Sequence, residues 1–300
     1  MRVLVTGATG FIGRRLCDRL AQGGHAVRAL SRNPGAEAAR LPGIERVFGL
    51  PGAGAELPDE AFAGLDAVVH LAGEAVSGRW TTAKRRAIET SRTAGTAALV
   101  RAIARATPRP RALVCASAIG YYGDRGDETL VEESLPGRGF LADVCRAWEM
   151  EAARAEALGV RVVRLRTGIV LDPAGGALAS MRSLFRAGLG GPLGSGRQWW
   201  AWIAMEDLVA LYEQALDRDW TGAVNAVAPE PVRQRDFARC LGRALGRPAL
   251  LPVPAFALRV ALGGFADELL FSRRVEPRTA LRHGHAFRAP RLGDALRAPR

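Results

Sequence analysis

Near its start the chain reads Val3-Leu4-Val5-Thr6-Gly7-Ala8-Thr9-Gly10-Phe11-Ile12-Gly13. A short apolar run, typical of a strand, leads into three glycines, and a segment with helical periodicity follows them. The first glycine permits a tight turn, the second lets the backbone approach a diphosphate, and the third lets the helix pack closely on the strand. The start of that helix offers N–H groups and the positive end of its dipole to phosphates. The stretch therefore predicts a dinucleotide-binding loop.

The end of the second predicted strand indicates which dinucleotide would bind. It reads Leu30-Ser31-Arg32-Asn33, where NAD-binding chains place Asp or Glu on the 2′-hydroxyl of the ribose. No acid is present, and the guanidinium of Arg32 with the hydroxyl of Ser31 suits a 2′-phosphate. The sequence therefore favours NADP(H) over NAD(H). The alternative is an ordinary surface arginine, so the missing acid carries more weight than Arg32 itself.

Short apolar runs alternate with helix-length segments through the first half of the chain. We expect strands at about 3–6, 26–30, 44–48, 67–71, 112–116 and 160–165, and helices at about 11–22, 82–105 and 141–158. Strands rich in β-branched residues between helices are typical of a parallel sheet covered on both faces. The pattern predicts an α/β fold: a Rossmann-type doubly wound parallel sheet with a smaller C-terminal lobe.

The domain boundary is expected near residue 170, where this regular alternation ends. We assign residues 1–170 to an NADP-binding Rossmann domain, to which a later segment of about 200–228 returns. Residues 171–300 would form the smaller substrate-binding lobe, with helices at about 206–216, 234–245 and 255–262.

The 300-residue chain has a formal net charge of +12, and all but one of its 42 basic residues are arginine. Half of the excess positive charge lies in residues 273–300, which contain eight arginines and two acidic residues, Glu276 and Asp294. Some basic termini bind nucleic acid or anionic lipid. Here no aromatic residues alternate with the arginines, as they do in single-strand binders. We therefore favour a solvated surface and expect no nucleic-acid or membrane partner.

The cysteines and the hydropathy of the chain indicate the cellular compartment in which the protein is expected. No run reaches the roughly 18 apolar residues of a membrane span, and we expect no signal peptide. The four cysteines, Cys17, Cys115, Cys145 and Cys240, form no CxxC pair. The sequence thus predicts no metal site and no disulfide framework, and the cytoplasm is the expected location.

Three later stretches carry further motifs: His70-Leu71-Ala72-Gly73, Cys115-Ala116-Ser117-Ala118 and Arg164-Leu-Arg-Thr-Gly168. They resemble the extended short-chain dehydrogenase/reductases, the superfamily of NAD-dependent epimerases and dehydratases. The resemblance puts Ser117 at the catalytic serine position. With the glycine-rich loop, it implies a cofactor site formed by Thr6, Gly7, Thr9, Gly10, Phe11, Ile12, Gly13, Ser31, Arg32, Leu71, Ala72, Gly73, Glu74, Arg92, Ala116 and Gly168.

Four more segments share a narrower pattern: Trp80 with Lys84, Gly120-Tyr121-Tyr122-Gly123, Gly194-Ser-Gly-Arg-Gln198-Trp199, and Pro252-Val-Pro-Ala-Phe256. They resemble the atypical, YfcH-like "epimerase family" subgroup. The resemblance implies a family-specific C-terminal domain of unknown function over residues 248–297. Two positions depart from the pattern: Ala204 replaces a histidine, and Leu50 replaces an acid expected near the adenine.

The superfamily's Tyr-x-x-x-Lys pair, whose tyrosine exchanges a proton with the substrate, is absent. The residues four positions after the three tyrosines are Arg125, Gly126 and Leu216. The only lysine, Lys84, precedes all three tyrosines. If the protein catalyses a reaction, another group must donate the proton.

Four residues are candidates for that chemistry. Ser117 is expected to orient a carbonyl through a hydrogen bond, because an alcohol is too weak an acid to donate its proton unaided. Tyr121 or Tyr122, which follow Ser117 at the carboxyl edge of the sheet, would donate the proton or form an aromatic wall. Cys145, near the place of the missing tyrosine, is either a weak acid or a small core residue.

Substrate-side candidates are Trp80, Lys84, Trp200 and Trp202. A spacing of two along a strand would direct Trp200 and Trp202 to one face, where they would stack on a substrate or close the interface between the lobes. Lys84 lies beside two arginines and is expected to be solvated. His70 is expected to be a core histidine rather than a base.

The favoured function is an NADP(H)-dependent oxidoreductase or epimerase that acts on an unidentified small carbonyl or hydroxyl compound. The alternative is a non-catalytic NADPH-binding regulatory or interaction protein, and a nucleic-acid binder is least favoured. Pairing through the two long helices, at about 82–105 and 141–158, would give a homodimer.

Overall fold

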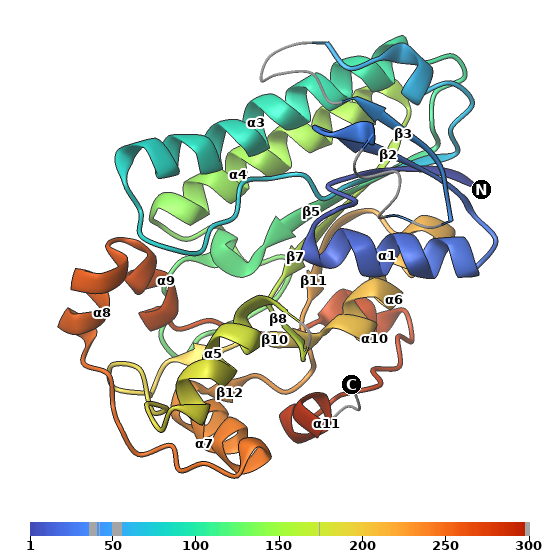
Figure 1. Ribbon diagram of the computed structural model, residues 1–300. Coiled ribbons are helices and arrows are strands. Elements are labelled where there is room, and N and C mark those ends of the chain that lie inside the picture. The colour runs from blue at the N-terminus through green and yellow to red at the C-terminus, as the bar shows by residue number, and fades with distance from the viewer. Residues whose placement is uncertain (36–40, 42, 50–55, 174, 298–300) are drawn as a thin grey trace.

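A seven-stranded parallel sheet forms the centre of the computed structural model (Figure 1). Its order is β11-β7-β5-β4-β1-β2-β3, and all neighbouring strands in it are parallel. The strands are β1 (Arg2–Thr6), β2 (Ala26–Ser31), β3 (Ile44–Gly49), β4 (Ala67–His70), β5 (Ala112–Ala118), β7 (Arg161–Thr167) and β11 (Gly222–Ala226). The structure describes the chain except for residues 36–40, 42, 50–55, 174 and 298–300, so the expectation for Leu50 lies outside the described residues.

The direction in which strands are added reverses beside β1. The chain forms β1, β2 and β3 outward, and then crosses back so that β4 lies on the other side of β1. Ligands of open parallel sheets bind in the crevice outside the carboxyl ends of the strands at such a reversal. The loops that follow β1 and β4 therefore border the candidate site.

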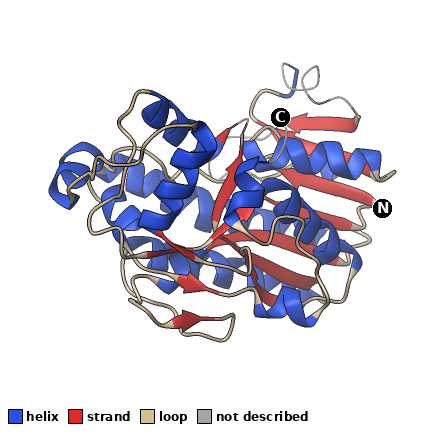
Figure 2. Cartoon of the chain, turned by 90° about the horizontal axis from the view of Figure 1, so that it is seen from below, coloured by secondary structure: helices blue, strands red, loops and turns tan. Residues whose placement is uncertain are grey.

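Helices cover both faces of the sheet. One face carries α1 (Phe11–Gln22) and α6 (Met205–Asp217), and the other carries α3 (Thr82–Arg105) and α4 (Phe140–Ala153) (Figure 1). Successive residues of β1 point to opposite faces: Val3 and Val5 belong to one core cluster and Leu4 to the other. Burial on both faces accounts for the continuous apolar runs of the sequence. Seen from below, the strands run side by side between the helices (Figure 2).

The C-terminal lobe consists of short elements and has its own core. Two-stranded sheets pair β8 (Ile169–Asp172) with β10 (Trp202–Ala204), β9 (Trp199–Trp200) with β12 (Val232–Arg233), and β6 (Thr129–Leu130) with β13 (Arg274–Val275). Its helices are α5 (Gly176–Arg186), α7 (Gln234–Leu245), α8 (Ala255–Leu262), α9 (Phe265–Leu270), α10 (Arg278–Arg282) and α11 (Leu292–Arg297). The core of the lobe includes Phe185, Trp200, Trp202 and Phe237.

Most predicted elements occur where they were expected, and α1, α3, α7 and α8 have the predicted bounds. The helix predicted over 141–158 is interrupted: α4 ends at Ala153, and a 3-10 helix, η3 (Arg154–Leu158), follows. Gly159, at φ +78°, then ends η3 in a left-handed conformation that suits glycine. Two other 3-10 helices are η1 (Asp59–Ala61) and η2 (Ile119–Tyr122).

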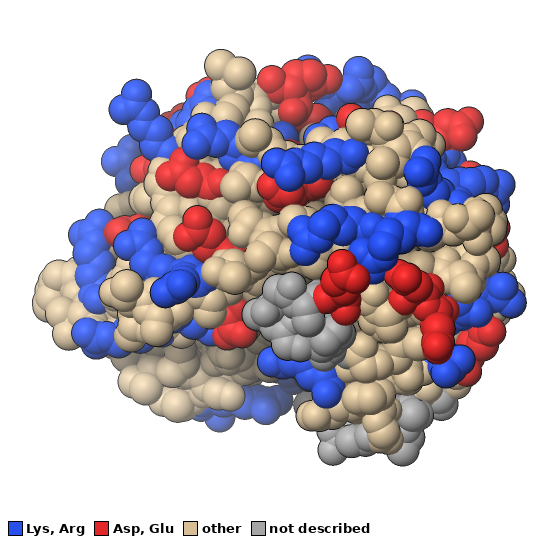
Figure 3. Space-filling view, turned by 90° about the horizontal axis from the view of Figure 1, so that it is seen from above, with Lys and Arg blue, Asp and Glu red and all other residues tan. Residues whose placement is uncertain are grey.

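The basic C-terminus is folded against the rest of the molecule. Arg273, which we expected on a solvated surface, is buried, and its Nη2 lies 2.6 Å from Glu268 Oε2. Arg282 Nη2 lies 3.0 Å from Glu133 Oε1, from a distant part of the sequence. Figure 3 shows basic and acidic side chains side by side on one face of the molecule. Ion pairs therefore hold much of this positive charge.

Among the residues that the structure describes, no helix is long and apolar enough to cross a membrane. In the same part of the chain, no three His, Cys, Asp or Glu side chains are grouped to hold a metal ion. The four cysteines are free thiols.

We predict that Gly13→Ala destabilises the fold. A Cβ at position 13 would lie 2.1 Å from the carbonyl oxygen of Gly7 and 2.8 Å from Cα of Ala8. Both atoms belong to the backbone of the glycine-rich turn, so helix and turn would have to separate. Such overpacking typically costs about 1–3 kcal/mol. Urea unfolding would measure the loss.

Gly95→Ala is the matched control. Position 95 lies within α3, and a Cβ there would meet no atom within 4 Å. Removing a helical glycine should stabilise the protein by roughly 0.5–1 kcal/mol. If Gly13→Ala were as stable as the unmodified protein or as Gly95→Ala, the tight packing at Gly13 would be refuted.

Candidate functional site

The glycine-rich turn between β1 and α1 forms one wall of the site. Gly7 has φ +72°, and a Cβ there would lie 2.8 Å from the carbonyl carbon of Leu71. The first turn of a helix leaves backbone N–H groups without helical acceptors. At α1, Gly10 is the N-cap, no side chain caps these groups, and no acid lies in the first turn. The turn thus presents free donors and a positive dipole end to the crevice.

The aromatic ring of Phe11 covers part of this turn. It is 37% exposed and packs against the backbone that opens α5, where a Cβ at Gly176 would lie 2.6 Å from the ring. Arg15, one turn further along α1, lies 3.3 Å from the carboxylate of Asp172 at the end of β8. The phosphate-binding wall is therefore in contact with the C-terminal lobe.

The end of β2 carries the residues expected to select the dinucleotide. Ser31 is buried, and its Oγ accepts a hydrogen bond from the backbone N–H of Asn33 at 3.2 Å. Arg32 is exposed, and among the described residues its guanidinium has no ion-pair partner. The cation is therefore free to meet a phosphate.

The opposite wall is the end of β4, where His70 links two elements. His70 Nδ1 lies 2.6 Å from Thr6 Oγ1 on β1, and Nε2 lies 2.9 Å from Thr96 Oγ1 on α3. Burial lowers the pKa of His70 to about 4. Because the ring is buried and both of its nitrogens are hydrogen-bonded, His70 is a core residue, as expected, and is not placed to act as a base on a substrate.

A cluster of charges follows on the β4 loop. Lys84 Nζ donates to Glu74 Oε1 at 2.6 Å, and this bond lowers the pKa of the Glu74 carboxyl, with smaller effects from the charges of Arg32 and Arg92. The expectation that Lys84 is solvated is wrong, because its side chain is only 24% exposed and is held by Glu74. Arg92 Nη1 donates to the carbonyl oxygen of Glu74 at 2.9 Å.

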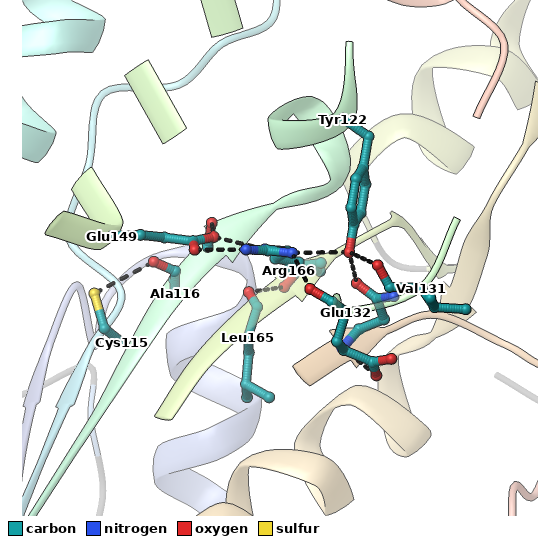
Figure 4. Close-up of polar contacts among 11 residues, drawn as sticks. Cys115, Ala116, Tyr122, Val131, Glu132, Glu149, Leu165 and Arg166 are labelled. Carbon is teal, nitrogen blue, oxygen red and sulfur yellow. Dashed lines mark hydrogen bonds and ion pairs between the residues drawn. The ribbon is translucent and has the colours of Figure 1, made fainter. Parts of the chain in front are cut away.

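A buried ion pair lies under the carboxyl edge of β5 and β7. Arg166 donates to both carboxylate oxygens of Glu149, with Nε 2.8 Å from Oε1 and Nη2 2.9 Å from Oε2. Burial lowers the pKa of Arg166, but the hydrogen bonds to Glu149 and Tyr122 outweigh it and raise this pKa above its usual range. Figure 4 shows Arg166 between Glu149 and Tyr122.

This pair engages two of the predicted catalytic groups. Ser117 is buried, and its hydroxyl donates to Glu149 Oε1 at 2.6 Å, so its proton does not point to a substrate carbonyl as expected. Tyr122 accepts from Arg166 Nη1 at 3.0 Å, and its hydroxyl lies 2.7 Å from Asn225 Oδ1. Burial raises the pKa of Tyr122 to about 12. Tyr122 as proton donor is therefore wrong; it is part of the core.

Tyr121 and Cys145 have different surroundings. The guanidinium carbon of Arg166 lies 3.5 Å from the centroid of the half-buried Tyr121 ring, which meets Tyr122 edge-on. Cys145 is 2% exposed, and burial, with the nearby charge of Glu149, raises the pKa of its thiol to about 12. The interpretation of Cys145 as an acid is wrong, and the core interpretation holds. Tyr121 keeps its place as a candidate.

Trp200 and Trp202 lie inside the core of the C-terminal lobe. Trp202 is 0% and Trp200 3% exposed, and their indole N–H groups donate to the carbonyl oxygens of Glu230 and Leu269. Rings so enclosed offer no face to a substrate, so the stacking role was wrong. Trp80 is half-buried, and its ring meets Phe140 edge-on at 5.0 Å.

The remaining predicted cofactor residues lie on the same edge of the sheet. Ala72 donates its backbone N–H to Thr6 Oγ1 at 3.2 Å, Ala116 pairs with Leu165, and Gly168 directly follows β7. Sequence reasoning missed the roles of Glu149, Arg166 and Asn225. Arg166 lies in a motif quoted above, whereas Glu149 and Asn225 lie outside those motifs, and only the fold brings the three together.

Two family models match this chain. The model of the NAD dependent epimerase/dehydratase family matches residues 3–227. The chain belongs to the NAD dependent epimerase/dehydratase family. A second model, a domain of unknown function, matches residues 253–298. The resemblance inferred from the motifs is thereby confirmed.

Other members of this family align over nearly the whole chain. A chloroplastic homologue of epimerase family protein SDR39U1 from Arabidopsis thaliana is 42% identical, over 99% of this chain and 86% of that protein. Epimerase family protein YfhF from Bacillus subtilis is 34% identical, over 99% and 97%. The crystal structure of human SDR39U1 with NADPH has a TM-score of 0.88 at 36% identity, over 99% and 98%.

Arg166→Met should destabilise the fold strongly. The substitution leaves the buried carboxylate of Glu149 without its guanidinium, and breaking a buried pair in this way costs about 3–5 kcal/mol. Arg146→Met is the matched control, because Arg146 pairs with Asp143 on the exposed side of α4, where a pair contributes at most about 1 kcal/mol. Urea unfolding of both variants checks this. Equal losses would contradict the importance of the buried pair.

Acidification should destabilise the protein in part through His70. The unfolded imidazole ionises near pH 6.5, whereas burial holds the folded pKa at about 4. The unfolded state takes up the proton first, so stability falls as the pH drops from 6.5 toward 4 and then levels off. In an NMR titration, the imidazole resonance that disappears in His70→Asn should stay unshifted down to about pH 5. A midpoint near 6.5 would refute its burial as a neutral group.

Proposed function

We propose that this protein binds NADP(H) at the carboxyl edge of its sheet and acts as an oxidoreductase or epimerase on a small carbonyl or hydroxyl compound. The observation that carries the proposal is the uncapped start of α1 behind a tight glycine turn, at the point where the strand order reverses. That geometry suits a diphosphate. The crystal structure of the 36% identical human SDR39U1 with NADPH supports it.

The residues present fit the cofactor. Gly7 lets the turn pack directly against the backbone of Leu71 and Ala72, and Gly13 lets α1 pack against the turn, so the uncapped start of α1 lies close to the β4 loop. At the far end, Arg32 would bind the 2′-phosphate, because it is exposed and β2 ends without an acid. When bound, NADPH supplies the hydride.

Tyr121 would supply the proton. Of the three tyrosines, it alone is half-buried, whereas Tyr122 and Tyr212 are fully buried. It follows β5 at the edge where the strands end, and Arg166 holds its ring in place from one side. The Glu149–Arg166 pair would thus position the phenol rather than exchange protons itself.

A non-catalytic NADPH-binding regulator is the second candidate. It is favoured by the fact that Ser117, Tyr122 and Cys145 are all buried and hydrogen-bonded or shielded from solvent. Such a protein would bind NADPH and change its affinity for a partner with the redox state of the nucleotide. Incubation with carbonyl compounds separates the two functions, since only the enzyme would consume NADPH, and only while Tyr121 is intact.

Calorimetric titration with NADPH and with NADH tests the binding. We expect NADPH to bind in the micromolar range or more tightly, and NADH at least about tenfold (1.4 kcal/mol) more weakly. Arg32→Gln should abolish this preference, because the 2′-phosphate loses its cation. Arg101→Gln, an exposed arginine on α3, is the control and should retain it. If neither nucleotide bound, the proposed function would fail.

A further inference from the structure

Arg92 is a largely enclosed cation at the back of the candidate site. It lies on α3, and its guanidinium carbon is 5.0 Å from the centroid of the Trp148 ring on α4. On its other side, a Cβ at Gly73 would lie 3.3 Å from the same carbon. The guanidinium therefore fills a narrow space between the β4 loop and α4.

The hydrogen bonds of Arg92 to described residues all come from one guanidinium nitrogen, Nη1. Nη1 donates to the carbonyl oxygens of Glu74 at 2.9 Å and Ile88 at 3.2 Å. Nε and Nη2 have no acceptor among the described residues, and neither is sealed from solvent. Nε and Nη2 therefore keep N–H donors that a ligand can reach, beside the β4 loop that is proposed to line the cofactor site.

No carboxylate of the described residues forms an ion pair with Arg92. The nearest one, on Glu74, is held by Lys84 at 2.6 Å. A guanidinium removed from water without a counter-ion is costly, and burial lowers the pKa of Arg92 accordingly. By contrast, the two arginines that are fully buried, Arg166 and Arg273, each bind a glutamate. Arg92 differs from them in having no carboxylate partner among the described residues.

We propose that Arg92 binds an oxyanion, a carboxylate or phosphate group, of a small ligand that lies against Gly73. A planar fork of N–H donors suits such groups and binds them with charge-assisted hydrogen bonds. The stacked Trp148 ring and the two carbonyl bonds hold the fork in position in advance. This inference rests on the proposed function and narrows its substrates to acidic compounds if the oxyanion belongs to the substrate. If it belongs to the cofactor, Arg92 is a phosphate ligand.

Calorimetry on Arg92→Met and Arg92→Lys tests the proposal, with Arg86→Met on the exposed face of α3 as control. NADPH is titrated first, and malonate or inorganic phosphate is then titrated into the NADPH-saturated protein and into the protein alone. If the substrate supplies the oxyanion, Arg92→Met weakens the malonate or phosphate probe at least tenfold and NADPH less than threefold. If the cofactor supplies it, NADPH weakens at least tenfold and the probe competes with it.

In either case Arg92→Lys should lose less affinity than Arg92→Met, because it keeps the charge, and the control should match the unmodified protein. Unfolding midpoints show whether each variant is folded, and Arg92→Lys carries the test if Arg92→Met is not. Unchanged affinities for NADPH and both probes would overturn the proposal. Failure of the unmodified protein to bind NADPH would instead refute the proposed function, while probe binding to the protein alone would still test Arg92.

Discussion

The buried bond between Glu149 and Arg166 is the constraint on which the rest of the site depends. Two charges removed from water are stable only if each satisfies the other and the remaining donors find acceptors. Arg166 therefore uses its other end on Tyr122 and on the carbonyl oxygen of Glu132, and Glu149 takes the hydroxyl of Ser117. In this way one ion pair ties β5, β7, α4 and the loop after η2 together at the carboxyl edge of the sheet.

That constraint also determines which groups remain for chemistry. The serine and one tyrosine that sequence motifs suggested are used to complete the network. Cys145, one turn before Glu149 on α4, is enclosed beneath it, and burial raises the pKa of its thiol. What remains on the accessible side is Tyr121, whose ring lies against the face of the same guanidinium. The network thus engages Ser117 and Tyr122, burial encloses Cys145, and Tyr121 is left beside the guanidinium.

Sequence reasoning succeeded where local rules dominate. The glycine turn, the positions of the sheet strands and the bounds of α1 and α3 follow from short-range patterns that burial on both faces reinforces. It failed for side chains whose role depends on distant partners. Glu149 and Arg166 are 17 residues apart, and Asn225 lies 103 residues from Tyr122. For Trp202 the sequence left a substrate platform and a packing role equally open, because its spacing, but not its burial, is visible in the sequence.

The cations around the site form a graded series. Arg166 is fully neutralised by Glu149, Lys84 shares the more exposed Glu74, and Arg92 and Arg32 have no carboxylate partner among the described residues. Arg32 follows β2 and Arg92 lies on α3, and the charges of both lower the pKa of Glu74 on the β4 loop. An anionic ligand bound beside that loop would therefore meet positive charge, and the uncapped start of α1 adds to it.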